Sequence, residues 1–374
     1  MYCRLFYLLK STLLCLSVIA AALGILLFPA AVGSGAANGI SYCLYTLAPS
    51  LFPFMALSAF MIHSGAANLF GKPFAPITKF LFRLPGCAGS VILLSMIGGY
   101  PVGARCCMLL LEQGAISQKQ ALRMLYFCIG AGPAFIISVV GGALLQNLTA
   151  GLLLFAAQIA AMICIGIGLG IAARIKKEPM PAKTPAKRIC QSPLVAAATD
   201  ASAGILNMSI FVILFSAFLA LLHTVGIAQV ICKLLLTLHV PQPIAAALLP
   251  MTMEITAGCN DAVFLHAPLT LIAFGLGFGG FCVQLQILAI VKNSGVSKLK
   301  FIGFRFLHGV LAASFTAIFA PLLPKQSVSV FQTTALPVVG SVSYSLPAGI
   351  ALVACCFLFL VCIKIRRGTE TGNE

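Results

Sequence analysis

The chain has 374 residues, of which 61% are hydrophobic and 8% are charged, and its mean hydropathy is +1.09. A soluble domain carries roughly 25% charged residues, so this composition excludes an ordinary soluble protein and predicts an all-α polytopic membrane protein. The net charge of +16 does not indicate nucleic-acid binding, because the basic residues flank apolar segments instead of forming one patch. Such flanking is typical of cytoplasmic loops, and one such group is Lys292, Lys298, Lys300 and Arg305.

The apolar segments predict about eight transmembrane helices of about 20 residues each. We expect them at residues 5–28, 41–62, 121–145, 148–173, 204–223, 268–291, 302–323 and 344–363. The expected organisation is an N-terminal helix and loop (1–40), a first repeat (41–173), a basic Pro-rich cytoplasmic linker (174–203), a second repeat (204–325), and a C-terminal helix with a basic tail (326–374).

Two further apolar segments, residues 86–111 and 243–259, are interrupted by glycine, proline and a charged residue. Irregular backbone at membrane depth is tolerated only where it is buried in protein or lines a watery cavity. Discontinuous helices of this kind mark the binding sites of secondary transporters. We therefore predict two re-entrant hairpins. If each hairpin enters and leaves on one side and the N-terminus is cytoplasmic, the basic loops lie inside and the loop 32–40 lies outside.

The two halves carry short matching motifs in the same order. Ser50-Leu51-Phe52 matches Ser209-Ile210-Phe211, and Pro85, before the first hairpin, matches Pro241, before the second. With a cytoplasmic N-terminus the second and fifth spans run in opposite directions. We therefore predict that the two repeats have inverted topology, as in many carriers.

Glu254 is a carboxylate inside an apolar segment that Pro250 and Gly258 interrupt. Placing a carboxylate there costs at least about 2.5 kcal/mol on insertion scales. Two interpretations remain open. Glu254 contacts the substrate or a coupling ion (H+ or Na+), or it is a structural hydrogen-bond partner that fixes the hairpin.

Arg105 is the charged residue of the first broken segment. Its planar guanidinium suits a carboxylate, so it could hold an anionic substrate or pair with Glu254. The structural alternative is an arginine that extends from the hairpin mouth toward the membrane surface.

The remaining candidates for substrate binding are small or polar residues at the interruptions. Glycines and prolines there permit chain reversals that leave helix N-termini, with free N–H groups and partial positive charge, pointing inward at an anion. The alternative is close helix packing through small residues. Gln284 and Gln286 can face one site only if their helix is unwound. These candidates are Gly99, Tyr100, Pro101, Gly103, Gly132, Pro133, Thr256, Gly258, Gly279, Gly280 and Gln284.

The sequence contains no constellation of catalytic residues. The motifs H-E-x-x-H, G-x-S-x-G and the P-loop are all missing, and the seven acidic residues leave little for acid–base chemistry. The fifteen cysteines lie mainly in apolar segments, where cysteine behaves as a small hydrophobe. We therefore expect neither enzyme activity, nor a cofactor, nor a metal site.

Two groups of motifs resemble those of a known family. The first is Gly99-Tyr100-Pro101-x-Gly103-Ala104 with Gly132-Pro133-x-Phe135-Ile136, and the second is Met253-Glu254-Ile255-Thr256-x-Gly258 with Gly277-x-Gly279-Gly280-x-x-Val283-Gln284-x-Gln286. They resemble the YlbJ-type sporulation integral membrane proteins over about residues 40–325. One departure is Cys282, where a small hydroxyl residue is expected.

The resemblance implies gate-like repeats of the nucleoside-recognition type, similar to those of concentrative nucleoside transporters. It also implies a role in endospore formation, with movement of dipicolinic acid from the mother cell across the outer forespore membrane. Two alternatives stay open: an ion-coupled nucleoside transporter, and a non-transporting scaffold for assembly of the spore cortex. The expected partners are the lipid bilayer, a small anionic substrate and a coupling ion, and the sequence leaves a homo-oligomer open.

Overall fold

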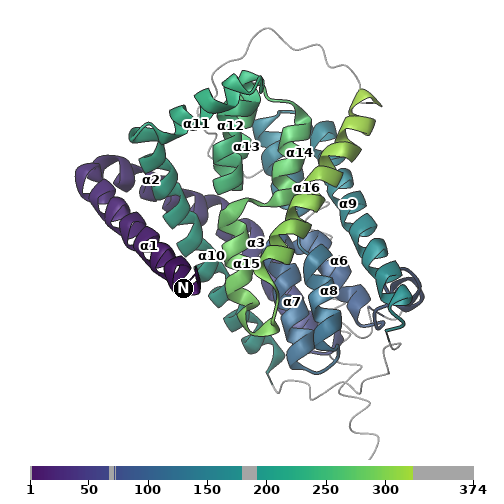
Figure 1. Ribbon diagram of the computed structural model, residues 1–374. Coiled ribbons are helices and arrows are strands. Elements are labelled where there is room, and N and C mark those ends of the chain that lie inside the picture. Colours follow the sequence, from purple (N-terminus) through teal and green to yellow (C-terminus); the bar gives the residue numbers. More distant parts are fainter. Residues whose placement is uncertain (1, 67–70, 72, 179–191, 323–374) are drawn as a thin grey trace, which may run out of the picture. The chain divides into compact units, whose positions relative to one another are not determined.

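The computed structural model describes residues 2–66, 71, 73–178 and 192–322 (Figure 1). All regular elements in this part of the chain are helices. The predicted span 344–363, the C-terminal segment 326–374 and residues 179–191 of the basic linker lie outside the described residues. The predicted linker boundary at residue 203 is wrong, because residues 193–203 already belong to helix α10 (Pro193–Thr224).

Apart from α1, and with residues 29–63 (α2, η1 and α3) taken as one long helix, the elements follow one order in each half of the chain. A long helix comes first, then a short helix, a pair of helices joined at a tight turn, a helix broken in its middle, and a second long helix. The first half contains α1 (Tyr2–Leu27), α2 (Pro29–Tyr42), η1 (Cys43–Leu47), α3 (Ala48–His63), α5 (Ala75–Ile77), η2 (Thr78–Phe82), α6 (Ala88–Gly98), α7 (Tyr100–Glu112), α8 (Gln118–Phe127), η3 (Ala134–Leu144) and α9 (Leu148–Ile175). The second half contains α10 (Pro193–Thr224), α11 (Ile227–Thr237), α12 (Gln242–Met253), α13 (Ile255–Phe264), α14 (Leu269–Phe278), α15 (Gly280–Ile290), η4 (Lys292–Ser294), α16 (Lys298–Phe319) and η5 (Ala320–Leu322).

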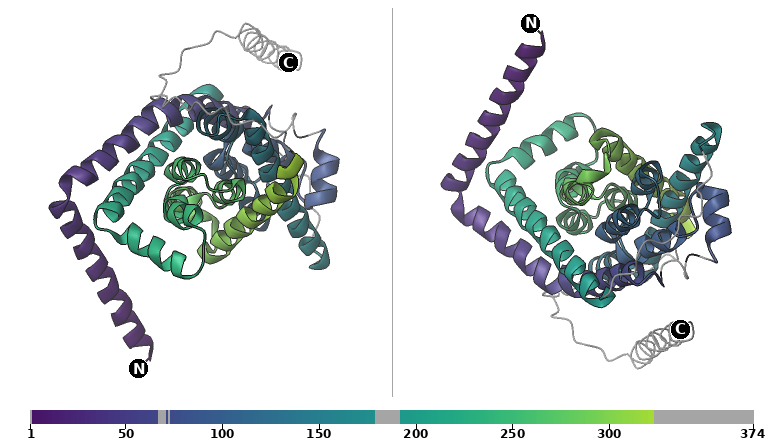
Figure 2. Two further views of the ribbon diagram at one scale, coloured as in Figure 1. Left: turned by 90° about the horizontal axis from the view of Figure 1, so that it is seen from above. Right: turned by 90° about the horizontal axis from the view of Figure 1, so that it is seen from below.

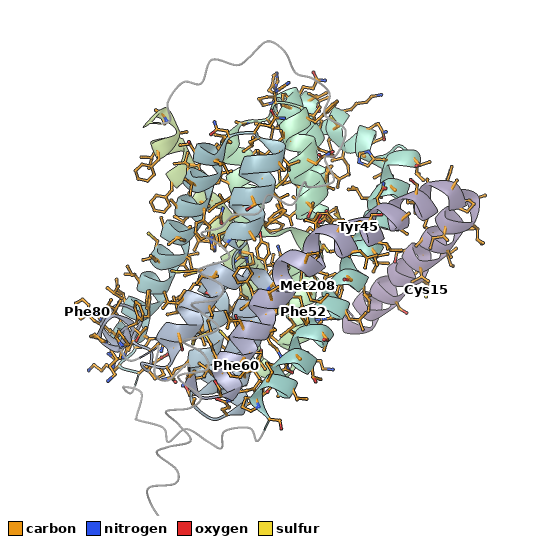
Figure 3. All side chains as sticks on the ribbon, turned by 180° about the vertical axis from the view of Figure 1, so that it is seen from behind. Cys15, Tyr45, Phe52, Phe60, Phe80 and Met208 are labelled. Atoms are coloured by element: carbon orange, nitrogen blue, oxygen red, sulfur yellow. The ribbon has the colours of Figure 1, made fainter. Side chains whose placement is uncertain are left out.

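Among the described residues, four helical segments are long and apolar enough to cross a membrane: α9, α10, α14–α15 and α16. A fifth is obtained if Cys15–Leu27 and Pro29–Leu47, which meet at 94°, are counted as one span. The molecule is therefore a helical protein with several membrane-length segments. Apolar side chains cover much of its exterior, as expected for a lipid-facing surface; Tyr45 and Phe80, for example, are 82% and 70% exposed (Figure 3).

The broken segment α14–α15 is the most enclosed of these four. Of its most apolar stretch 78% is buried, against 39% for α9, 28% for α10 and 33% for α16. Seen from above and below, the green helices of the second half lie inside a surround of longer helices (Figure 2). The central position of a Gly-interrupted helix keeps its irregular backbone away from lipid, as the energetics of unpaired backbone groups requires.

The prediction of an outside loop at residues 32–40 is wrong, because these residues belong to α2. Glycines on α2 let its backbone approach α10 closely. A Cβ atom on Gly35 would lie 2.7 Å from the Ser216 carbonyl oxygen, and one on Gly39 would lie 2.9 Å from the Ile213 Cα atom. The small residues that resembled a loop are therefore a helix-packing surface.

In both tight-turn helix pairs, a glycine four residues after the turn lets the two helices approach each other closely. In the first pair, α6 and α7 meet at Gly99, and a Cβ atom on Gly103 would lie 2.9 Å from the Ser95 Cβ atom and would also overlap the Cys128 carbonyl oxygen at the end of α8. In the second pair, α12 and α13 meet at Glu254, and a Cβ atom on Gly258 would lie 2.2 Å from the Met251 Cα atom. The second arm of each pair thus folds back on the first without side-chain volume between them.

Candidate functional site

The turns of the two helix pairs meet the two broken helices around a partly open cavity of about 50 Å³. By this measure a water molecule needs roughly 10–15 Å³, so the cavity has room for a few waters. Met208 of α10, labelled in Figure 3, is one of its walls. The lining residues are Tyr42, Thr46, Leu47, Leu51, Gly99, Tyr100, Pro101, Ala131, Gly132, Phe135, Val139, Met208, Val212, Glu254, Ile255, Thr256, Val283 and Gln286.

Each turn packs against the break of its own half. A Cβ atom on Gly99 would lie 3.3 Å from the Gly132 backbone nitrogen, in the irregular segment between α8 and η3. A Cβ atom on Gly280, where α14 gives way to α15, would lie 3.2 Å from the Met253 carbonyl oxygen. These close approaches bring backbone from four helix ends to the cavity.

Glu254 supplies the carboxylate of the site. It is 4% exposed, its backbone is extended, and it is the N-cap residue of α13. One carboxylate oxygen accepts a hydrogen bond from the Thr256 N–H at 3.0 Å, and the other accepts one from the Ala257 N–H at 2.7 Å. The partial positive charge of the helix end thereby stabilises the carboxylate. These two hydrogen bonds show how Glu254 can fix the start of α13, which is its structural role.

Tyr100 connects the two halves at the cavity. Its hydroxyl donates a hydrogen bond of 2.5 Å to the Leu276 carbonyl oxygen, near the C-terminus of α14. A Cβ atom on Gly279 would lie 3.3 Å from the Tyr100 ring. The first helix pair is therefore tied to the broken helix of the second half.

Six of the candidate residues line the cavity: Gly99, Tyr100, Pro101, Gly132, Glu254 and Thr256. The others lie outside the lining. Gly103 and Gly258 are packing positions within the helix pairs, Pro133 precedes η3, and Gly279 with Gly280 forms the break before α15.

Of the two glutamines, Gln286 and not Gln284 lines the cavity. The Gln284 side chain is buried and donates a hydrogen bond of 3.2 Å to the Phe278 carbonyl oxygen. Because α15 is helical at both positions, the two side chains point in different directions.

Arg105 does not line the cavity, and of its open interpretations the pairing with Glu254 is wrong. Its guanidinium forms an ion pair with Asp200 of α10, with 2.5 Å between Nη2 and Oδ1. The other Asp200 oxygen lies 2.8 Å from the His63 Nε2 atom. These three residues from α7, α10 and α3 form a separate cluster, and sequence reasoning missed Asp200.

Sequence reasoning also misplaced Arg305, which it grouped with cytoplasmic lysines. Arg305 is 1% exposed and donates hydrogen bonds to the Ile129 and Gly277 carbonyl oxygens. These carbonyls belong to the ends of α8 and α14, where the two helices break. A cation suits the negative C-terminal ends of helices, so Arg305 joins the two breaks. Its place inside an expected span, three residues before His308, was the available signal.

Within the described residues, no three His, Cys, Asp or Glu side chains lie close enough together to hold a metal ion. The chemistry of the cavity is therefore that of one carboxylate, a few hydroxyl and amide groups, and the backbone of several helix ends.

Comparison with known proteins agrees with the family resemblance. No protein-family model matches the chain, and no solved structure matches it. The chain is 30% identical over 317 residues to sporulation integral membrane protein YlbJ of Bacillus subtilis (strain 168), and the match covers 78% of each sequence. With that coverage and the membrane-length helices of its structure, the chain is a multi-pass membrane protein that belongs to the YlbJ family of sporulation integral membrane proteins.

Proposed function

We propose that this protein is a sporulation transporter that carries a small organic anion, dipicolinic acid, across the outer forespore membrane. In this proposal the two helix pairs are re-entrant hairpins, the two halves are inverted gate-like repeats, and the whole chain has about eight transmembrane helices. The protein is a carrier and not an enzyme, and it needs no cofactor.

The observation that carries the proposal is the meeting of two tight-turn helix pairs and two broken helices at one cavity. Broken helices that meet near the centre of a membrane protein provide backbone groups for a substrate and its coupling ion. A scaffold protein has no need of such an arrangement, since each interruption gives up hydrogen bonds within a helix.

The cavity contacts proposed for the anion are the N-termini of α7 and η3. Neither helix has a side-chain cap, whereas Glu254 caps α13. Uncapped N-termini present N–H groups and partial positive charge to an anion. Because Arg105 lies outside the cavity, these backbone groups replace it as the proposed contacts there.

The proposal is tested by uptake of labelled dipicolinate into proteoliposomes that contain the full-length protein. Empty liposomes are the control, unlabelled nucleosides are the competitors, and uptake of labelled nucleosides is measured in parallel. Uptake that nucleosides leave unchanged supports the anion carrier. Uptake of nucleosides instead would identify the ion-coupled nucleoside transporter, and a folded protein that carries neither would favour the scaffold.

A further inference from the structure

Arg105 and Asp200 line a second, smaller cavity of about 10 Å³, and the His63 Nε2 atom lies 2.8 Å from Asp200. We call these three residues the access cluster. Asp200 takes part in two of the three ion pairs that the described residues form, and it joins α10 to α7 and to the end of α3. The cavity beside it is lined by Met55, Ser58, Ala59, Val102, Arg105, Cys106, Asp200 and Ala201.

The two cavities follow one another along the same three helices. On α3, Leu51 lines the central cavity and Met55 lines the second one, one turn later. On α10, Met208 lines the central cavity and Ala201 the second one, two turns earlier. On α7, Pro101 lines the central cavity and Val102 lines the second one.

Met55 lines the second cavity and packs on α10. A Cβ atom on Gly204 would lie 2.2 Å from the Met55 Cε atom, so the flexible methionine end packs directly on bare α10 backbone. Beyond Met55, the access cluster ties the three helices together. The two cavities are therefore candidates for parts of one interrupted route, in which Met55 would be the constriction and the Arg105–Asp200 ion pair the closure.

The access cluster lies at the cytoplasmic end of this route. Asp200 is seven residues after Pro193, the first residue of α10, which at 1.5 Å per residue is about 10 Å along the helix. The basic linker precedes α10, and basic loops of membrane proteins are cytoplasmic. His63 is the last residue of α3, which is followed by a segment with Lys72 and Lys79.

The side chains of the access cluster are partly exposed. The Arg105 side chain is 35% exposed, and those of Asp200 and His63 are 18% and 16% exposed. Arg105 contacts Asp200 through one terminal nitrogen, although a guanidinium can hold a carboxylate through two parallel bonds. Arg105 therefore keeps donor capacity for a second carboxylate at its exposed side.

We propose that the access cluster is a carboxylate-binding site at the cytoplasmic mouth of the route. In the closed state the Asp200 carboxylate pairs with the Arg105 guanidinium. As the route opens, a carboxylate group of the incoming anion replaces Asp200 at Arg105. This proposal rests on the proposed anion transport for its ligand. The closure itself rests on the geometry of α3, α7 and α10 alone.

Competition between Asp200 and the substrate gives the two charge deletions opposite effects on the KM for dipicolinate. Asp200→Asn removes the internal competitor and should lower KM severalfold. Arg105→Ala removes the binding group and should raise KM tenfold or more, because a hydrogen bond to a charged group is lost, whereas Arg105→Lys should lie between Ala and wild type. Glu178→Gln is the matched control, since Glu178 pairs with Arg123 at 3.7 Å and lies outside both cavities. A shift of KM in the same direction in Asp200→Asn and Arg105→Ala would overturn the proposal.

A second measurement reports opening without relying on transport. Cys106 lines the second cavity and is 2% exposed, whereas its neighbour Cys107 is fully buried outside the lining of both cavities. Two variants of the full chain, each keeping one of these cysteines, are labelled in inverted membrane vesicles with a membrane-impermeant maleimide. Asp200→Asn should raise the labelling rate of Cys106 at least tenfold and leave Cys107 unlabelled. No change at Cys106, or an equal rise at Cys107, would refute the closure.

The two measurements separate the failure of one proposal from that of the other. If the wild-type protein carries no dipicolinate but Asp200→Asn exposes Cys106, the closure stands and the substrate is wrong. If the wild-type protein carries dipicolinate while neither KM nor labelling responds as expected, transport stands and the access cluster is a structural ion pair.

Discussion

Replacing Glu254 by glutamine separates the structural from the functional role of this residue. The carboxylate accepts hydrogen bonds from two backbone N–H groups, one on each oxygen. The glutamine amide has only one acceptor oxygen, so one of the two N–H groups loses its partner, which costs about 1–3 kcal/mol. Removing the charge relieves an insertion cost of at least about 2.5 kcal/mol. Because these terms have similar size and opposite sign, Glu254→Gln should insert and fold with a stability close to that of the wild type.

Dipicolinate uptake should nevertheless be abolished in Glu254→Gln, since the cavity loses its one carboxylate. The assay is uptake into proteoliposomes, with the thermal unfolding temperature of the purified protein measured in parallel. Glu254→Asp is the matched control, because aspartate keeps the charge and is a favoured N-cap residue; it should retain part of the uptake. Full uptake by a stable Glu254→Gln protein would refute the functional role and leave Glu254 as a helix cap.

Other substitutions test the packing that surrounds the cavity. Arg305→Met should lower the free energy of unfolding by about 1–3 kcal/mol for each backbone carbonyl left without a donor. The control Lys300→Met, at an exposed position of the same helix, should leave it unchanged. Equal unfolding temperatures of the two variants would contradict the role of Arg305 in joining the two helix breaks. Gly103→Ala and Gly258→Ala should each prevent close folding of a helix pair and lower the yield of folded protein. Gly168→Ala, with open space around its Cβ position, should give a wild-type yield, and a wild-type yield from all three would contradict the packing argument.

The family, the helical class and the positions of the main interruptions could be predicted from the sequence. Gly99 and Glu254 interrupt apolar segments whose length and composition are otherwise those of helices, and the structure turns the chain at both residues. The glycine-rich residues 32–40 were misassigned because their conformation depends on a tertiary contact. Glycine weakens an isolated helix, and only the close approach to α10 makes α2 favourable.

Six of the residues proposed from the sequence line the central cavity, but the positions of Arg105 and Arg305 differ from expectation. Arg105 had three open interpretations: binding of an anionic substrate, pairing with Glu254, or extension toward the membrane surface. The structure pairs Arg105 with Asp200, which stands 95 residues away in sequence. Arg305 was assigned to a cytoplasmic group because it follows Lys298 and Lys300. Two helix C-termini that meet at Arg305 make burial favourable, and no local pattern reveals that meeting.

The composition of the cavity lining leads to a final prediction about coupling. The lining contains the Glu254 carboxylate and no lysine or arginine. At about 5 Å and an effective dielectric constant of about 20, two unit negative charges repel by roughly 3 kcal/mol. A dicarboxylate that enters this cavity therefore needs a cation to offset Glu254, and we expect H+ or Na+ to bind with it.

Dipicolinate binding to the wild-type protein should accordingly strengthen when the coupling cation is supplied, either as the pH falls or as Na+ replaces a larger cation. The expected change is about a hundredfold in Kd, since roughly 3 kcal/mol corresponds to two factors of ten. In Glu254→Gln the same titrations should leave Kd constant, because the amide already lacks the charge. The measurement is equilibrium binding of labelled dipicolinate to the purified protein. An equal response of both proteins to the cation would place the coupling site away from Glu254, and the absence of any response in the wild type would mean that the anion binds without a coupling ion.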